Sequence, residues 1–249
     1  MSLQPGFVLH RRAYTETSLL IEVFTATAGR LPLVAKGVYR ARAPRVALLQ
    51  LFQPLWLDWR GRGEVKTLTH AEAAGMPWPL RGERLYCGFY LNELLLRLLG
   101  REEPAPALFA AYWRALERLT DCATPPDAGL RQFELALLRA LGYELTLECT
   151  AIDGAPVQPK ERYRFVNEAG LYPVTTEDGH HGAVTGDTLH RLARDLPLDA
   201  RHRREARHLL RQALAPYLGP QPLRSRALFR AAARDTHAER NEASGEASA

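Results

Sequence analysis

Apolar and polar residues alternate with a period of two through residues 1–75, which is the pattern of half-buried β-strands. In residues 18–25, for example, Leu19, Ile21 and Val23 all fall on one face. Glycine-containing turns divide the region into short segments. A series of short strands like this fits a small Greek-key barrel of the OB type. We predict five strands, at residues 6–11, 18–25, 30–36, 50–59 and 64–72.

The period changes to that of amphipathic helices after a proline-rich break at residues 76–79. Asp127 is the expected N-cap of the third helix, and Gly142 fits its C-terminal cap. Short strands and turns are expected in residues 145–183, including a hairpin. The hairpin pairs residues 163–166 with 170–174, and the predicted helices are 83–99, 106–119, 127–141, 187–196, 199–218 and 225–233.

These elements predict an α+β multidomain fold, with a five-stranded OB-type β-barrel followed by a mainly α-helical domain that carries a small strand/turn insertion. The tail has no apolar anchor and is expected to be disordered. The predicted domains are the barrel at 1–78, the first helical part at 79–144, the insertion at 145–184, the second helical part at 185–235 and the tail at 236–249.

Composition supports folded cores, because hydrophobic residues make up 46% of the 249 residues. No apolar stretch is long enough to span a membrane. The first six residues lack a basic segment followed by an apolar run, so we expect no secretory signal and a cytoplasmic protein. Cys87, Cys122 and Cys149 form no C-x-x-C pair, which argues against a disulfide framework and a four-ligand zinc site.

Positive charge is concentrated in two separate parts of the chain, although the net charge is only +5. Residues 1–80 contain ten Lys and Arg against five Asp and Glu, and residues 185–235 contain eleven against five. Residues 81–184, in contrast, contain eleven basic and fifteen acidic residues. Two basic regions that flank an acidic one indicate a polyanionic partner.

The loop at residues 36–45 combines four cations with one aromatic residue. In an OB barrel, loops beside the binding face hold a nucleic-acid strand while aromatic side chains stack on its bases. Arginine and lysine bind the phosphates. An ordinary solvated basic loop has the same composition and is the alternative. The predicted DNA-binding residues of this loop are Lys36, Tyr39, Arg40, Arg42 and Arg45.

A second basic stripe lies on the predicted helix 199–218. At 100° per residue, its cations share one arc and its apolar residues share the opposite arc. Such a stripe can follow a phosphate backbone, but it is equally the solvated face of a packed helix. The predicted DNA contacts are Arg201, Arg204, Arg207 and Arg211.

Two tryptophans, Trp56 and Trp59, lie three residues apart on one predicted strand. Successive side chains of a strand alternate between its faces, so these two point to opposite sides. One is expected in the core, and the other is a candidate stacking platform for bases. Which tryptophan takes which role depends on the strand register and stays open.

The sequence gives little indication of a catalytic site. Asp58, Glu64 and Lys66 are spaced like the carboxylates and lysine of a metal-dependent nuclease, but they also fit the polar side of a strand. Residues 180–181, a histidine pair, and Cys149 match no standard metal-ligand spacing. No G-x-S-x-G, P-loop or G-x-G-x-x-G sequence occurs. We expect no enzyme activity, no catalytic residue, no metal and no cofactor.

The order of these elements and several strings resemble the RecO family of bacterial recombination mediators. The strings occur in the same order as in that family and together span residues 5–232. They are Phe7-Val8-Leu9-His10, Glu16-Thr17-Ser18-Leu19-Leu20, Leu33-Val34-Ala35-Lys36-Gly37, Gly63-Glu64-Val65-Lys66-Thr67-Leu68, Tyr90-Leu91-Asn92-Glu93-Leu94-Leu95, residues 131–138, Leu141-Gly142-Tyr143 and Pro222-Leu223-Arg224-Ser225-Arg226.

The resemblance implies binding of single- and double-stranded DNA, annealing of complementary strands, and action at the nucleoid. It also implies partnership with RecR and help in loading RecA onto DNA coated by single-stranded DNA-binding protein (SSB). Some family members carry a four-cysteine zinc module in the insertion. This chain keeps only Cys149 there, so no zinc is carried over. A nuclease and an OB-type RNA-binding factor remain the alternatives.

The SSB tail is acidic and ends in apolar residues with a free carboxylate, so its receptor needs an apolar groove rimmed by arginine. The helical domain is the expected receptor. Leu130, Arg131 and Phe133 on the helix 127–141 are the predicted anchor, with Arg131 taken as an exposed helix residue.

Overall fold

The computed structural model describes residues 3–39, 45–127, 129–174 and 182–229. Two compact units make up the chain. The barrel unit comprises Met1–Thr25, Arg30–Glu102 and Pro220–Ala249, and the helical unit comprises Ala26–Gly29 and Glu103–Gly219.

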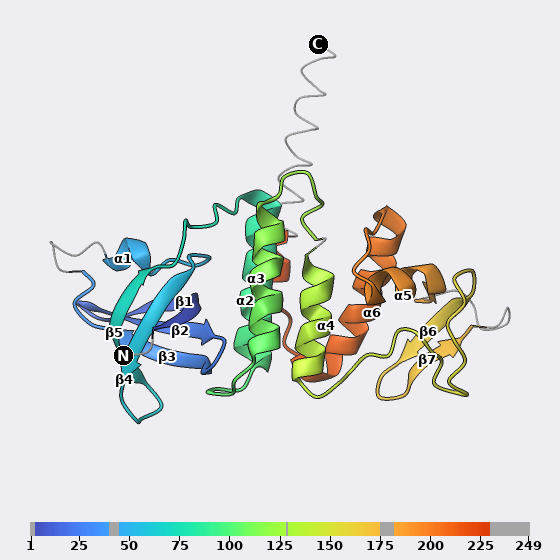
Figure 1. Ribbon diagram of the computed structural model, residues 1–249, viewed down its shortest axis with the longest axis horizontal. Helices are drawn as coiled ribbons and strands as arrows, with labels where there is room; N and C mark the ends of the chain where they lie inside the picture. Colours follow the sequence, from blue (N-terminus) through green and yellow to red (C-terminus); the bar gives the residue numbers. More distant parts are fainter. Residues whose placement is uncertain (1–2, 40–44, 128, 175–181, 230–249) are drawn as a thin grey trace, which may run out of the picture. The chain divides into compact units, whose positions relative to one another are not determined.

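Five strands close into a barrel in the order β1-β2-β3-β5-β4 (Figure 1). The pairing is antiparallel between β1 and β2, β1 and β4, and β4 and β5, and it is parallel between β3 and β5. A short helix, α1, precedes β4. The predicted OB-type barrel is therefore confirmed. The bounds are β1 (Gln4–Thr15), β2 (Ser18–Thr25), β3 (Gly29–Ala35), α1 (Arg45–Leu48), β4 (Leu55–Arg60) and β5 (Lys66–Ala73).

The barrel interior holds the apolar residues of the predicted alternation. Leu19, Ile21 and Val23 of β2 are at most 3% exposed, and Phe7 of β1 is fully buried. The fourth strand begins later than predicted. Phe52 has a φ of +62°, a left-handed conformation that does not continue a strand, so regular pairing with β5 starts only at residue 55.

Helix α2 (Gly82–Leu98) packs within the barrel unit. The buried Asn92 amide donates a hydrogen bond to the Leu9 carbonyl of β1 at 2.9 Å. Gly88 permits close approach, because a Cβ there would lie 2.7 Å from the ring of Phe52. The barrel unit continues to Glu102, so α2 belongs to it.

The helical unit contains four helices and a small sheet in the described residues. The predicted helices and the predicted hairpin are confirmed, and a two-residue strand, too short to show a period, joins the hairpin. The sheet order is β7-β6-β8. The bounds are α3 (Pro106–Thr120), α4 (Leu130–Ala140), β6 (Arg162–Val166), β7 (Gly170–Pro173), β8 (Val184–Thr185), α5 (Gly186–Ala193) and α6 (Ala200–Leu218).

The two ends of α4 differ in how well the sequence predicts them. Gly142 has a φ of +84° and its N–H donates to the Arg139 carbonyl at 3.0 Å, so the predicted C-terminal cap is confirmed. The predicted N-cap is wrong, because Gly129 occupies that position and has no capping side chain. The Asp127 carboxylate instead forms ion pairs with Arg203 and Arg207 of α6.

After α6 the chain returns to the barrel unit, where α2 holds it. The Glu93 carboxylate accepts hydrogen bonds from the N–H groups of Arg224 at 2.8 Å and Ser225 at 2.9 Å. Burial alone raises the pKa of Glu93, but these hydrogen bonds outweigh it and leave the pKa below its ordinary value. Residues 224–229 are helical, and the rest of the predicted helix and the tail lie outside the described residues.

Among the described residues, no helix combines the length and the hydrophobicity needed to cross a bilayer.

Candidate nucleic-acid interface

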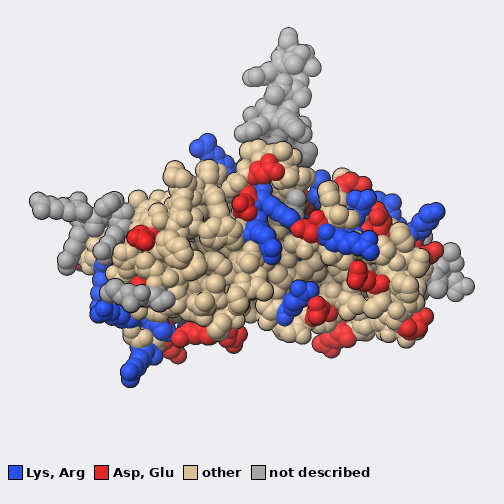
Figure 2. All heavy atoms as spheres, in the orientation of Figure 1, with Lys and Arg blue, Asp and Glu red and all other residues tan. Residues whose placement is uncertain are grey.

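The β1–β2 hairpin carries exposed cations and an exposed tyrosine at one end of the barrel. All residues from His10 to Thr17 are exposed, and Tyr14 keeps 58% of its surface accessible. Arg12 is exposed and has no ion-pair partner among the described residues. In Figure 2, Lys and Arg side chains gather over the barrel on the left, whereas basic and acidic side chains are interspersed over the helical unit.

The segment that follows β3 is fastened to this hairpin at both of its described ends. The Val38 N–H donates to the Thr17 carbonyl at 2.9 Å, and the Val38 side chain is 2% exposed. At the other end, Arg11 donates to two carbonyl groups of residues 46–49, at 3.1 and 3.2 Å. Residues 36–39 and 45–49 therefore lie at the same end of the barrel as the hairpin.

Anchoring of Val38 leaves the neighbouring side chains in solvent. Lys36 is exposed, as predicted, and Tyr39 keeps 49% of its surface accessible. Arg40 and Arg42 lie outside the described residues, and only the backbone of Arg45 is described, at the start of α1. The structure thus brings Lys36 and Tyr39 together at the hairpin.

The tryptophan prediction is wrong in one respect, because neither side chain belongs to the core. Trp56 is 38% exposed and Trp59 is half-buried, whereas Leu55 and Leu57 supply the buried face of β4. A register shift between residues 58 and 59 breaks the regular alternation of the strand. Such irregularities arise from pairing with a neighbouring strand, so a single strand's sequence does not show them.

The basic stripe of α6 is partly neutralised by carboxylates of its own unit. Arg207 forms an ion pair with Asp127 at 3.0 Å, and Arg201 forms one with Glu205 at 3.1 Å. Arg204 and Arg211 are exposed. Paired arginines attract phosphate less than free ones, so these ion pairs reduce the positive charge that the stripe can offer to a phosphate backbone.

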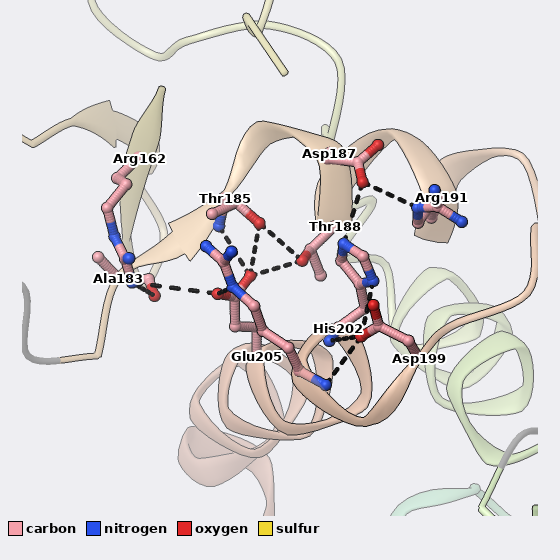
Figure 3. A network of polar contacts seen from close by, with 10 residues as sticks. Arg162, Ala183, Thr185, Asp187, Thr188, Arg191, Asp199, His202 and Glu205 are labelled. Carbon is pink, nitrogen blue, oxygen red and sulfur yellow. Dashed lines mark hydrogen bonds and ion pairs between the residues drawn. The ribbon is translucent and has the colours of Figure 1, made fainter. Parts of the chain in front are cut away.

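Figure 3 shows the polar network that surrounds Glu205. Its carboxylate accepts hydrogen bonds from the Thr185 N–H at 3.0 Å and from the hydroxyls of Thr185 and Thr188 at 2.6 and 2.5 Å. His202 of the same helix lies between two further carboxylates, 3.0 Å from Asp187 and 2.9 Å from Asp199. The network joins β8, α5 and α6, and we assign it a structural role.

The Glu205 network makes a testable contribution to stability. Burial raises the pKa of Glu205, but hydrogen bonds from Thr185 and Thr188 outweigh it and hold the pKa at about 2. The ionised side chain therefore stabilises the fold above its ordinary pKa of 4.5, and this stabilisation fades as the pH falls toward 2. We expect Glu205→Gln to lower the free energy of unfolding by about 2 kcal/mol at neutral pH, measured by urea unfolding.

The effect of Glu205→Gln should shrink steadily as the same measurement is repeated at lower pH. Asp153→Asn is a suitable control because that carboxylate is fully exposed and bonds only within its own turn. A destabilisation by Glu205→Gln that does not change with pH contradicts the assignment.

The predicted SSB-tail anchor is not an exposed set of residues. Leu130 is 4% exposed and Phe133 is fully buried. Arg131, expected at the surface, has a side chain only 6% exposed and forms an ion pair with Glu134 at 2.6 Å. The expectation of an exposed arginine is therefore wrong, because α4 buries that face. The Arg131 Nε has no hydrogen-bond partner among the described residues.

The nuclease residues do not form a catalytic constellation. Lys66 is 9% exposed and pairs with Glu102 at 2.5 Å, whereas Glu64 lies exposed in the β4–β5 turn. Asp58 accepts a hydrogen bond from the adjacent Trp59 N–H. Within the described ranges, no group of three or more His, Cys, Asp or Glu side chains is placed to hold a metal. The histidine pair at 180–181 lies outside those ranges.

Sequence reasoning missed four exposed residues of the barrel. Arg12 and Tyr14 follow the predicted end of the first strand, which in fact continues to residue 15. Arg60 precedes Gly61, and Arg62 lies between Gly61 and Gly63 of the β4–β5 turn. The turns between strands one and two and between strands four and five are the loops with which OB barrels hold oligonucleotides, so this loop position was the signal available in the sequence.

A closed barrel with a cationic, tyrosine-bearing end, followed in the chain by a helical unit, defines a multidomain protein of the OB-barrel class. Residues 1–76 match the family model "Recombination protein O N terminal", and residues 80–227 match "Recombination protein O C terminal". The chain therefore belongs to the RecO family of DNA repair proteins.

Relatives of the chain carry the same description over nearly their whole length. A DNA repair protein RecO from Nitrosococcus oceani is 49% identical over 227 residues, which cover 91% of this chain and 92% of that protein. The protein of that name from Methylococcus capsulatus is 45% identical, with 92% and 93% covered. The one from Serratia proteamaculans is also 45% identical, with 90% and 92% covered.

Proposed function

We propose that this chain is a recombination mediator that binds single- and double-stranded DNA and anneals complementary strands. With RecR, it helps load RecA onto SSB-coated DNA in the cytoplasm, at the nucleoid. In this role no covalent bond is made or broken, so the chain needs no catalytic group or cofactor. Membership of the RecO family over residues 1–227 supports the proposal.

The observation that carries the proposal is the contrast between the two basic regions. At the barrel end, Arg12 and Lys36 are exposed without carboxylate partners in the described residues. On α6, two of the four predicted DNA contacts, Arg201 and Arg207, are engaged in ion pairs. Unpaired, exposed cations are the ones that exchange their counterions for phosphates, so the barrel end is the primary DNA site.

Annealing follows from electrostatics at this site. Two DNA strands repel each other through their phosphates, and cations that neutralise both backbones lower this repulsion. Tyrosines that accept unstacked bases keep single strands open for pairing. DNA affinity should fall steeply as salt is added, because phosphate binding releases condensed counterions.

The test is annealing of complementary, SSB-coated strands, with and without RecR. We expect the chain to accelerate duplex formation, RecR to change the rate, and labelled strands to remain intact in Mg²⁺ or Mn²⁺. Competition by RNA of the same sequence separates a DNA mediator from an RNA-binding factor. Strand cleavage, a preference for RNA, or no acceleration on coated strands rejects the proposal.

We further propose that the SSB tail binds beside Arg131. The partnerless Nε of this buried guanidinium supports the assignment, since an incoming carboxylate can bind it or replace Glu134. We expect Arg131→Met combined with Glu134→Gln, which removes both buried charges together, to weaken binding of a tail peptide about tenfold. Fluorescence anisotropy of a labelled peptide measures the change.

Arg139→Gln is the matched control for the tail peptide, because Arg139 lies on the same helix with a side chain 69% exposed. The thermal midpoint of each variant shows whether the fold is retained. Equal peptide affinity in the folded double variant and the wild-type chain removes Arg131 from the site.

A further inference from the structure

The exposed tyrosines of the described residues are not evenly distributed. Tyr14 and Tyr39 are the two most exposed, at 58% and 49%, and both lie at the hairpin end of the barrel. Tyr217, at 40%, belongs to the helical unit. Exposing large aromatic rings beside cations has no benefit for folding, so their placement points to a ligand with flat, apolar faces.

The backbone holds both tyrosines in place without using their side chains. Tyr14 lies on β1, where Ala13 and Thr15 pair with β2 on either side of it. Tyr39 directly follows Val38, which is buried and hydrogen-bonded to Thr17 in the β1–β2 turn. Both rings are therefore presented from ordered backbone, which limits the entropy lost when a ligand binds.

Cations accompany these rings at the same end of the barrel. Arg12 precedes Tyr14 by two residues on β1 and both side chains are exposed, and a register shift between Ala13 and Thr15 interrupts the regular pleating at Tyr14. Lys36 precedes Tyr39 by three residues. Glu16 is the one exposed carboxylate of residues 10–17 and 36–39, so the positive charges prevail.

The exposed tryptophan lies in a different electrostatic environment. Trp56 of β4 lies directly opposite Glu72 of β5. Two residues further along β4, Asp58 lies directly opposite His70. Directly opposed residues share one face of an antiparallel pair, so the carboxylates of Glu72 and Asp58 lie on the face of Trp56, together with His70, which is 3.3 Å from Glu72. Carboxylates on this face disfavour a phosphate backbone beside Trp56.

We infer that Tyr14 and Tyr39 are the base-stacking residues of this chain and that Arg12 and Lys36 bind the phosphates beside them. The ligand is single-stranded DNA, because only unpaired bases offer free faces to aromatic side chains. The inference rests on the proposed DNA binding and adds which residues distinguish single strands from duplexes. Trp56 takes no part.

The experiment compares the affinities of the full chain for an ordinary single strand and a base-free strand of equal length and charge. We expect Tyr14→Ala combined with Tyr39→Ala to weaken binding of the ordinary strand about 30-fold, since stacking contributes on the order of five-fold or more per base. The affinities for the base-free strand and for duplex DNA should not change. The salt dependence of DNA affinity should not change either.

Arg12→Gln combined with Lys36→Gln is the complementary variant. It should weaken binding of the ordinary strand and of the base-free strand equally, and it should reduce the slope of log affinity against log salt by about 1.4 for single strands. Trp56→Ala and Tyr217→Ala are the aromatic controls and should leave the ordinary-to-base-free ratio unchanged.

The outcomes separate two kinds of failure. Absence of DNA binding by the wild-type chain rejects the proposed function itself. If the wild-type chain binds but does not prefer the base-bearing strand, or if the preference survives loss of both tyrosines, the stacking assignment is overturned while DNA binding stands. Loss of the preference in Trp56→Ala alone overturns it as well.

Discussion

A fourfold glutamine variant of the loop at residues 36–45 will bind DNA at least about 100-fold more weakly at roughly 0.1 M salt, whatever the sequence of the DNA. Its substitutions are Lys36→Gln, Arg40→Gln, Arg42→Gln and Arg45→Gln. Each phosphate contact on a single strand contributes about 0.7 to the slope of log affinity against log salt, so four lost contacts make the slope shallower by about 2.8. The loss is uniform across sequences because phosphates carry no base information. Salt titrations with labelled oligonucleotides measure both quantities.

A matched variant controls for net charge. Arg114, Arg139, Arg164 and Arg194 are exposed residues of the helical unit, and replacing all four with glutamine removes the same charge. We expect this variant to lose less than about tenfold, because in the proposed function these arginines contact no phosphate and contribute only general attraction, which salt screens. If the barrel variant binds DNA as tightly as the helical-unit variant, the loop at residues 36–45 is not the DNA site.

Gly186→Ala will destabilise the helical unit by about 3 kcal/mol and lower its thermal midpoint by about 6–12 °C. A Cβ on Gly186 would lie 2.0 Å from the carbonyl oxygen and 2.7 Å from the carbonyl carbon of Gln158, so backbone must move. The Gly186 N–H also donates to the Glu161 carbonyl at 2.9 Å, which holds the two segments together. Unfolding followed by the helical circular dichroism signal measures the effect.

This prediction opposes the one that local propensity makes. Gly186 begins α5, and alanine is better than glycine in a helix by about 1 kcal/mol, so propensity alone predicts stabilisation. Gly63→Ala is the control, since a Cβ there meets nothing within 4 Å, and its effect should stay within about 0.5 kcal/mol. Equal or greater stability of Gly186→Ala shows that the Gln158 backbone yields at little cost.

Residue spacing was enough to predict most secondary structure of this chain. The period-two pattern of Leu19, Ile21 and Val23 predicted β2 because alternate side chains of a strand share a face. The opposing arcs of α6 were predicted in the same way, and Ala206 and Leu210 are fully buried as expected. These features follow from the backbone geometry of a single segment, so the sequence of that segment is enough to predict them.

Partners of charged and aromatic side chains were not predictable from spacing. Arg131 looked like an exposed helix residue, but α4 turns it inward to Glu134. Arg207 looked like a free cation, but it pairs with Asp127, 80 residues away. A register shift in β4 moved Trp59 out of the expected alternation. The Arg207 and Trp59 outcomes depend on contacts between distant parts of the chain, and the burial of Arg131 depends on how α4 packs in its unit.

By itself, the sequence determined which segments are strands and helices, that the first of them form an OB-type barrel, and which regions carry positive charge. Only the tertiary structure decided which cations stay exposed and which form ion pairs within the chain. The physical reason is that backbone periodicity is a local property, whereas exposure and ion pairing are set by packing. Arg12, Tyr14, Lys36 and Tyr39 are exposed at the same end of the barrel because the Val38–Thr17 hydrogen bond places residues 36–39 beside the β1–β2 hairpin.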